Sequence, residues 1–217
     1  VILQAVHQAR PNPLLAAFID LIGAYDNVNR NLLWAKLAAL GLPAKMLRLI
    51  QASYRYPAMS VKMAGVRSET FLTGKGLRQG SALSPFLFNL FINSLVPALN
   101  LTGCGSKVGE TLVSCLLYAD DLVFLSDSEV GLQKLLDCTG DFLSEYQLAA
   151  NFAKSAVLCF NKAIPKASWM LSGKLLEVRE KYSYLGITLH TSRSWHVQTG
   201  KAKAISADSL EMLRAIG

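Results

Sequence analysis

The chain has 217 residues, of which 52% are hydrophobic and 17% charged, so it is no disordered tail and is long enough for one or two domains with a real core. Lys and Arg number 22 against 15 Asp and Glu, a formal net charge of +7. This excess is compatible with a polyanionic partner such as a nucleic acid, but charge alone fits a merely basic protein equally well.

The four cysteines (Cys104, Cys115, Cys138 and Cys159) form neither a CxxC pair nor a metal-ligand spacing. Three lie in apolar surroundings, which predicts reduced core residues in an intracellular protein. No N-terminal signal pattern is visible. The chain begins with Val rather than Met, and we therefore expect a fragment of a longer polypeptide.

The first half of the chain predicts a strand, two helices and a hairpin. LLAAFIDL (14–21) is an apolar run without helical periodicity, typical of a strand buried on both faces. Asp26 and Asn27 offer N-cap chemistry for a helix that stops at Gly41, and Pro43 opens a second helix. The segments 59–65 and 68–73, joined at Gly65, predict a hairpin.

An uncharged stretch, residues 82–101, has the length of a membrane span. However, Asn89 and Asn93 lie one helical turn apart, and Pro85 and Pro97 bracket the segment. We therefore predict a buried helix over 84–100 and no membrane association.

The second half predicts an amphipathic helix over 130–148, because apolar residues recur there at three and four positions. Short strands are expected at 154–160 and 182–189, with a hairpin around Ser172 and Gly173 between them and a final helix over 196–216. Strand pairs mixed with helices on one face indicate an α+β fold.

Two adjacent carboxylates, Asp120 and Asp121, interrupt the apolar run LLYADDLVFLS. We expect two strands over 111–126 that meet at this pair. Carboxylates about 5 Å apart repel by about 3 kcal/mol at an effective dielectric of 20. Protonation or a divalent ion such as Mg²⁺ or Mn²⁺ relieves this repulsion, although spacing alone leaves a solvated surface turn equally open.

Asp20 ends a second apolar strand immediately before a turn. If that strand lies beside the 112–126 hairpin, three carboxylates meet at one end of a sheet, and we expect Asp20 and Asp120 to share one ion with Asp121 adjacent. Three carboxylates, two ions and a phosphate form the apparatus of two-metal nucleotidyl transfer.

Five ordered blocks carry a family resemblance: FIDLIGAYDNVNR, GLRQGSALSPFLFNLFIN, YADDLVFL, ANFAKSAVLCF and KYSYLGITL. Their order and spacing resemble the palm motifs of reverse transcriptases, most closely those of non-LTR (LINE-type) retrotransposons. The resemblance implies a polymerase palm over 1–190, an antiparallel sheet backed by helices. It also implies part of the fingers at about 30–80, and a truncated thumb that starts at 191–217.

By this resemblance, Asp20 and the carbonyl of Leu21 bind metal together with Asp120, and Asp121 supports them. The implied cofactors are two Mg²⁺ (or Mn²⁺) ions. Tyr25 corresponds to the aromatic residue that lies under the incoming sugar, where the ring leaves no room for a 2′-hydroxyl. Without the motif, Tyr25 would be interpreted as an interior aromatic residue.

Arg78, Gln79 and Gly80 match the block that contacts the nucleotide and template. Gly80 allows close backbone approach, and the Gln79 amide can hydrogen-bond without a charge partner. Taken alone, these residues indicate a loop before a helix that Ser84 and Pro85 start.

Lys154 matches the lysine that protonates the pyrophosphate leaving group, although a lysine that begins a strand is usually just solvated. Tyr184, Leu185 and Gly186 resemble the primer-grip turn.

The leading hypothesis is therefore an RNA-directed DNA polymerase that uses an RNA template, a DNA primer and dNTPs. The family suggests a nuclear location, and the sequence leaves the oligomeric state open. The alternative is an inactive nucleic-acid-binding remnant, but random decay is expected to damage at least one of the three aspartates. An RNA-directed RNA polymerase is disfavoured by Tyr25.

Overall fold

The computed structural model describes residues 1–9, 12–55, 58–161 and 167–192. The helix predicted over 196–216, and with it nearly all of the predicted thumb, lies outside these residues. The helices are α1 (Ile2–Gln8), α2 (Arg30–Ala39), α3 (Ala44–Ser53), α4 (Leu83–Ile92), α5 (Leu95–Leu101) and α6 (Glu129–Glu145). The strands of the main sheet are β1 (Leu14–Asp20), β8 (Cys115–Tyr118), β9 (Asp121–Ser126) and β10 (Ala156–Phe160).

Within the described residues, ten shorter strands form two-stranded pairs outside this sheet. They are β2 (Ala58–Met59) with β5 (Phe71–Leu72), β3 (Lys62–Met63) with β4 (Val66–Arg67), β6 (Ser106–Val108) with β7 (Thr111–Val113), β11 (Met170–Leu171) with β12 (Lys174–Leu175), and β13 (Lys181–Tyr184) with β14 (Ile187–His190). The hairpins predicted around Gly65 and around Ser172 and Gly173 are thereby confirmed.

The main sheet has the strand order β10-β1-β9-β8, and every neighbouring pair is antiparallel. β1 is central and buried on both faces, as predicted. Its residues Leu15, Ala17 and Ile19 belong to one core and Leu14, Ala16 and Phe18 to the other. A strand covered on both sides needs apolar residues at every position, which explains its unbroken hydrophobic run.

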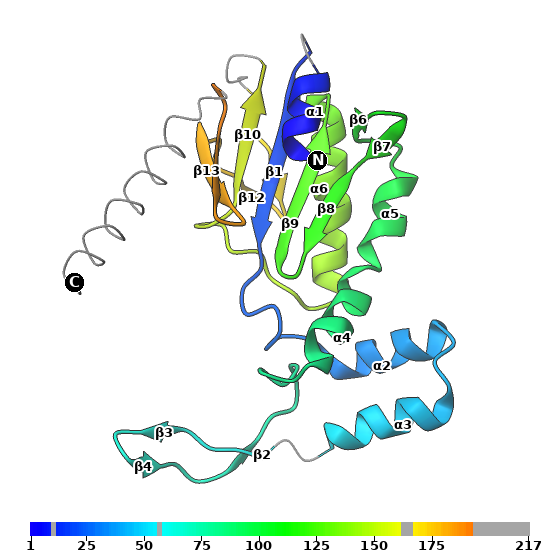
Figure 1. Cartoon of the computed structure of the whole chain (residues 1–217), viewed down its shortest axis with the longest axis vertical. Coiled ribbons are helices and arrows are strands. Elements are labelled where there is room, and N and C mark those ends of the chain that lie inside the picture. The colour runs from blue at the N-terminus through cyan, green and yellow to red at the C-terminus, as the bar shows by residue number, and fades with distance from the viewer. Residues whose placement is uncertain (10–11, 56–57, 162–166, 193–217) are drawn as a thin grey trace, which may run out of the picture.

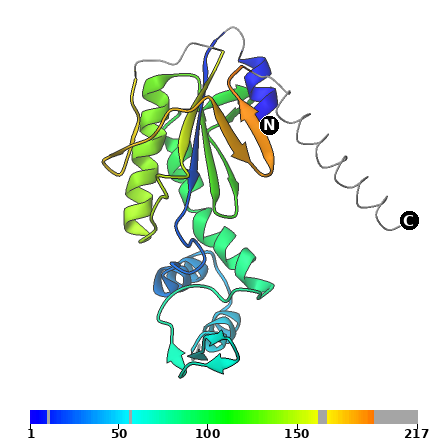
Figure 2. The same ribbon diagram turned by 90° about the vertical axis from the view of Figure 1, so that its left-hand side faces the viewer.

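Helices cover one face of the sheet, and the other face carries α1 and the β13–β14 hairpin. Figure 2 shows the sheet nearly edge-on between these two layers. The larger core joins the sheet to α2, α4, α5 and α6, whereas the smaller core includes residues of α1 and Leu189 of β14. The α+β class and the helix-backed antiparallel sheet are therefore confirmed.

The predicted helix over 84–100 is interrupted, because α4 ends at Ile92 and α5 begins at Leu95. Pro97 has no N–H to donate to the carbonyl of Asn93, which accepts from the N–H of Val96 at 3.2 Å instead. In the described part of the chain, 83–101 is the one segment long and apolar enough to cross a membrane. Phe88, Phe91 and other residues of this segment pack in the core, as the sequence predicted.

Two predicted helix starts were wrong. The N-cap of α2 is Asn29, whose Oδ1 accepts from the N–H groups of Asn31 and Leu32, rather than Asp26 or Asn27. Ser84 lies inside α4, which begins at Leu83.

The strand predicted over 182–189 is instead the β13–β14 hairpin. Leu185 and Gly186 reverse the chain there with positive φ angles, a conformation that a hydrophobic run does not reveal.

All four cysteines are thiols rather than disulfides, with Cys159 buried and the others half-buried. The segment that holds α2, α3 and the short strands β2 to β5 extends beyond the end of the sheet (Figure 1). Its assignment to fingers, like the division of the chain into domains, stays a prediction.

Candidate active site

The carboxylates Asp20 and Asp121 meet at one end of the main sheet. Asp20 is the last residue of β1 and Asp121 the first of β9, and the two are direct cross-strand partners. Both are partly exposed although their strands are buried. Adjacent antiparallel strands thus bring together two like charges that are 101 positions apart in the sequence, as their place at the ends of apolar strands predicted.

Asp120 lies in the two-residue turn between β8 and β9. Ala119, the first residue of the turn, has a φ of 52°, a conformation that costs a residue with a Cβ about 1–2 kcal/mol. The predicted meeting of two strands at this turn is therefore confirmed, but the first strand is shorter than predicted, because Thr111–Val113 forms β7 and pairs with β6.

The electrostatics show that the three carboxylates act on one another. Burial, and then the negative charges of Asp120 and Asp20, raise the pKa of the Asp121 carboxyl, whereas the positive charge of Lys154 opposes the shift. A cation between these groups would relieve the repulsion, and carboxylate oxygens are the ligands that Mg²⁺ and Mn²⁺ prefer. The donor set therefore fits a hard divalent ion.

The carboxylates do not form a closed metal cage. Among the described residues, no three His, Cys, Asp or Glu side chains lie close enough together to hold a metal ion. Mg²⁺ is usually bound through one or two carboxylates, with substrate phosphates and water as the remaining ligands. A site that binds the ion together with its substrate is therefore expected to lack a complete set of protein ligands. The sharing of one ion by Asp20 and Asp120 stays a prediction.

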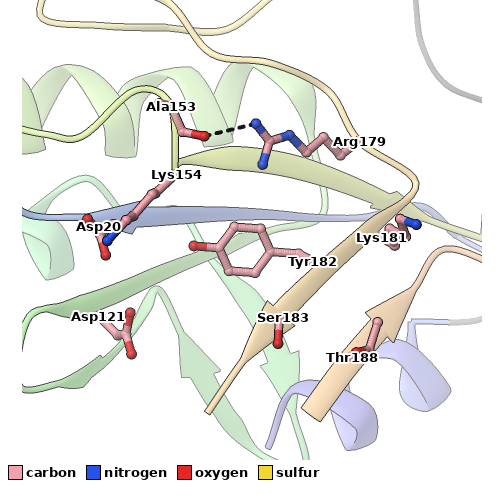
Figure 3. Close-up of a pocket in the computed structure, with 9 residues that line it drawn as sticks. All are labelled: Asp20, Asp121, Ala153, Lys154, Arg179, Lys181, Tyr182, Ser183 and Thr188. Atoms are coloured by element: carbon pink, nitrogen blue, oxygen red, sulfur yellow. Dashed lines mark hydrogen bonds between the residues drawn. The ribbon is translucent and has the colours of Figure 1, made fainter. Parts of the chain in front are cut away.

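A pocket of about 550 Å³ opens beside Asp20 and Asp121. Figure 3 shows the Lys154 side chain and the Tyr182 hydroxyl pointing toward the side of the pocket where the carboxylates lie. The pocket also holds Arg179, whose guanidinium donates to the carbonyl of Ala153 at 3.0 Å. The site therefore combines two carboxylates with cations in one open cavity.

Short contacts fix the backbone at Asp20. Its N–H donates to the buried Ser155 hydroxyl at 3.2 Å, and its carbonyl accepts from the N–H of Asn151 at 2.8 Å. The N–H of Ile22 donates to the carbonyl of Ala149. This bridge does not engage the carbonyl of Leu21, the group assigned to the metal by the resemblance.

The β13–β14 hairpin, which carries the predicted primer-grip residues, is packed on β1. The Tyr182 ring stacks on Phe18 with centroids 4.5 Å apart, and the Tyr184 ring contacts Phe18 at 5.6 Å. Burial and the charge of Asp121 raise the pKa of both tyrosines, and Asp20 adds to the shift at Tyr182. The hairpin therefore places both tyrosine hydroxyls close enough to the carboxylates to feel their negative charge.

Tyr25 lies on the other side of the β8–β9 turn. It lines a second pocket of about 590 Å³ together with Tyr118 and Ala119. Its ring stacks on Phe88 of α4 with centroids 4.7 Å apart and an interplanar angle of 21°. Burial, and then the charge of Asp120, raise the pKa of its hydroxyl. Tyr25 is thus a braced ring close to the turn that carries Asp120.

The predicted nucleotide-contacting residues lie in an exposed loop before α4. Gln79 Nε2 donates to Asp26 Oδ1 at 3.0 Å, and the Arg78 guanidinium contacts the ring of Tyr54 at 5.7 Å. Gly80 has a φ of 77°, and a Cβ there would meet nothing within 4 Å. The loop thus offers open backbone and two polar side chains on the side of the molecule where Tyr25 lies.

Sequence reasoning missed several residues of this site. Tyr182 lies two positions before Tyr184 on one strand, so the period of two already placed both on one face. Ser155 follows Lys154 directly, but its contact with Asp20 joins residues 135 positions apart. Asp26, which holds Gln79, has no signal in the sequence beyond that of a helix cap.

An antiparallel sheet with helices on one face and carboxylates at the end of its central strands is the architecture of a palm-type polymerase. The chain belongs to the reverse transcriptase (RNA-dependent DNA polymerase) family, whose profile matches residues 3–189.

Relatives of the chain come from mobile elements. The chain is 36% identical over 148 residues to the Pol polyprotein of the type-2 retrotransposable element R2DM of Drosophila melanogaster, covering 68% of this chain and 14% of the relative. It is 29% identical over 184 residues to the RNA-directed DNA polymerase of the mobile element jockey of Drosophila funebris, covering 82% and 20%. These relatives confirm the predicted resemblance to non-LTR retrotransposon reverse transcriptases. The match spans a fifth or less of the length of each relative.

A solved structure has the same fold. The apo telomerase of Candida tropicalis, truncated from its C-terminal domain, superposes with a TM-score of 0.59 at 17% identity, over 86% of this chain and 36% of the telomerase chain. At that identity the likeness extends to the fold alone.

Proposed function

We propose that the chain is the catalytic palm of an RNA-directed DNA polymerase, which adds dNTPs to a DNA primer on an RNA template. The observation that carries the proposal is the cross-strand pairing of Asp20 with Asp121, next to Asp120 in the turn. Family membership supplies the reaction class. The substrates, primer and template come from the relatives and from the chemistry of the site.

Two Mg²⁺ or Mn²⁺ ions are the proposed cofactors. Asp20, Asp120 and the carbonyl of Leu21 would hold them, with Asp121 in support. When bound, the ions lower the pKa of the primer 3′-hydroxyl and neutralise charge on the triphosphate. The Ser155 hydroxyl and the N–H of Asn151, which bond to the backbone of Asp20, keep the first ligand in place.

The chain's own side chains select and orient the nucleotide. Tyr25, braced by Phe88, fills the space that a 2′-hydroxyl would need. Arg78 and Gln79 contact the nucleotide and template from the loop before α4, and Gly80 lets the backbone approach closely. Holding the triphosphate in line is most of what this chemistry requires.

We assign proton transfer and primer placement to residues in and next to the pocket that Asp20 and Asp121 line. Lys154 donates a proton to the leaving pyrophosphate, because its ammonium group lines the pocket that contains Asp20 and Asp121. Tyr184, Leu185 and Gly186 hold the primer end at the turn of the β13–β14 hairpin. The pocket of about 550 Å³ is lined by Lys154 together with Tyr182 and Ser183 of β13, the strand that leads to this turn.

Primer extension tests the proposal. The complete polypeptide encoded by the gene is given an RNA template, a DNA primer, Mg²⁺ and labelled dNTPs, and is compared with D20N and D120N variants. We expect extension by the wild type and a loss of at least about a thousandfold in both variants. Binding of the duplex without extension by the wild type would favour the inactive remnant.

Metal binding gives a readout that does not depend on activity. Millimolar Mn²⁺ should raise the melting temperature of the wild type, because a ligand that binds only the folded state stabilises it. D20N and D121N should lose most of this gain, whereas D127N, whose exposed aspartate follows the opposite end of β9, should keep it. Equal gains in all four proteins would remove the carboxylates from metal binding.

A further inference from the structure

Arg30, the first residue of α2, is bonded to the loop that leads to Arg78 and Gln79. Its Nε donates to the carbonyl of Gly76 at 2.7 Å and its Nη1 to the carbonyl of Thr73 at 2.7 Å. Its Nη2 donates to the carbonyl of Lys75 at 2.9 Å and to the Thr73 hydroxyl at 3.2 Å. One guanidinium group thus joins three successive parts of a loop that lies 43 to 46 positions away in the sequence.

Arginine suits this task because its planar fork carries five donors in fixed directions. A lysine has one ammonium group at the end of a flexible stem and cannot reproduce three carbonyl contacts from one plane. Burial lowers the pKa of Arg30, and the positive charge of Arg78 lowers it further, although Tyr54 opposes the shift. Guanidinium keeps its charge in such surroundings.

The helix that carries Arg30 is itself anchored to the palm. The preceding residue, Asn29, caps α2 through Oδ1, and its Nδ2 donates to Oε1 of Gln147 at 2.9 Å. Gln147 follows the C-terminal end of α6, which packs under the main sheet. Arg30 therefore bonds the loop to a helix whose start is itself fixed to the segment after α6.

The loop also lies directly against the segment that carries Tyr25. The N–H of Leu77 donates to the carbonyl of Tyr25 at 2.8 Å, and the N–H of Gly76 donates to that of Val28 at 2.9 Å. A Cβ at Gly76 would lie 2.7 Å from the Asp26 carbonyl oxygen, so no larger residue fits without a shift of the backbone. Arg30 thus holds the loop against Tyr25 and Asp26.

A shared aromatic ring continues the connection to Arg78. The Arg30 and Arg78 guanidinium groups lie 5.2 Å and 5.7 Å from the ring centre of Tyr54. The Ser84 hydroxyl donates to the carbonyl of Arg78 and lies 3.4 Å from the Tyr54 hydroxyl. The position of Arg78 therefore depends on the same cluster that Arg30 organises.

We propose that Arg30 is a positioning residue of the polymerase, which fixes the 73–80 loop so that Arg78 and Gln79 face the incoming deoxynucleoside triphosphate. The inference rests on the proposed function. Arg30 does not contact the nucleotide in this proposal. It affects nucleotide affinity only by placing Arg78 and Gln79.

The test compares R30K and R30M with the wild type in the complete polypeptide, with R48K as the matched control. Arg48 is an exposed arginine on α3. In single-nucleotide extension, we expect R30K to raise the KM for dNTP about tenfold, because the lysine loses several charge-assisted hydrogen bonds that place the loop. We expect kcat to change by less than about threefold, because Arg30 does not touch the reacting atoms. R48K should leave both constants unchanged.

Hydrogen exchange of the amides provides a readout without turnover. The N–H groups of Gly76 and Leu77 should exchange at least about tenfold faster in R30K and R30M, whereas those of β1 and β9 keep their wild-type protection. Faster exchange throughout the sheet in R30M would mean that this variant is destabilised as a whole. The conservative R30K variant then decides the question.

The outcomes separate the two proposals. Wild-type incorporation together with an unchanged KM in R30K would overturn the positioning role alone, whether or not the loop amides exchange faster. Absence of incorporation by the wild type would overturn the proposed function, and the positioning role with it. Partial recovery of the KM of an R30A variant by added methylguanidinium would support direct placement of the loop by the guanidinium group.

Discussion

The side-chain amide of Gln79 is held by the carboxylate of Asp26, with Nε2 3.0 Å from Oδ1 and 3.3 Å from Oδ2. Because the NH₂ end of the amide faces the carboxylate, the carbonyl end is the one available to accept a hydrogen bond from a ligand. Asp26 follows Tyr25 directly, so one short segment carries both the proposed sugar gate and the partner of a nucleotide-contacting residue.

Replacing Asp26 with alanine should therefore release Gln79. We expect the KM for dNTP to rise by about fivefold to tenfold, because an exposed hydrogen bond to a charged acceptor is lost. Asp26→Asn keeps an acceptor oxygen and should remain within about threefold of the wild type. Steady-state extension measures the difference, and equal values for the two variants would show that the hydrogen bond does not matter.

Asp121 should make the metal-free protein less stable as pH rises. Burial and the charges of Asp120 and Asp20 raise its pKa, so the folded state binds this proton more tightly than the unfolded state does. Its contribution to stability is therefore present below the unfolded value of about 3.9 and is lost as pH rises through the folded pKa.

The D121N variant has no such charge and should melt about 1–2 °C above the wild type at pH 7 without metal, a small gain because solvent screens a partly exposed group. The difference should shrink as the pH is lowered toward 4. Thermal melts at several pH values measure it, with D127N at the opposite end of β9 as a control. A D121N protein less stable than the wild type at pH 7 would contradict the prediction.

The ring of Tyr25 should decide between deoxynucleotides and ribonucleotides. Tyr25→Val removes the ring, and we expect discrimination against ribonucleotides to fall by at least about tenfold while dNTP incorporation largely survives. Tyr25→Phe keeps the ring stacked on Phe88 and should keep the discrimination. Competitive incorporation of dNTP and rNTP gives the ratio. An unchanged ratio in the valine variant would make Tyr25 a packing residue only.

Leu185, in the proposed primer-grip turn, should be a strained residue. Its φ is 48° and its side chain is 49% exposed, so it has an unfavourable backbone conformation with little burial in return. Leu185→Asn should stabilise the protein by about 1 kcal/mol, because asparagine tolerates this region. Chemical denaturation measures the gain, and Leu185→Ala, which keeps the strain, should show none. A destabilised asparagine variant would mean that the leucine side chain packs after all.

The sequence alone determined those helices, strands and motifs that depend on residues close together in the chain. The unbroken apolar run of β1 predicted a strand buried on both faces, and the 130–148 periodicity predicted α6. Asp20 and the Asp120–Asp121 pair were identified because carboxylates rarely occur within such runs. Five ordered motifs identified the family, since their residues are close together within each block.

Only the tertiary structure decided which distant residues meet. It paired Asp20 with Asp121, placed Tyr182 beside them, and joined Arg30 to a loop more than 40 positions away. The period of a strand or helix reports which face a residue occupies but not which element covers that face. That choice is made when strands pair and side chains from remote segments pack together, because only then does each buried donor find its acceptor.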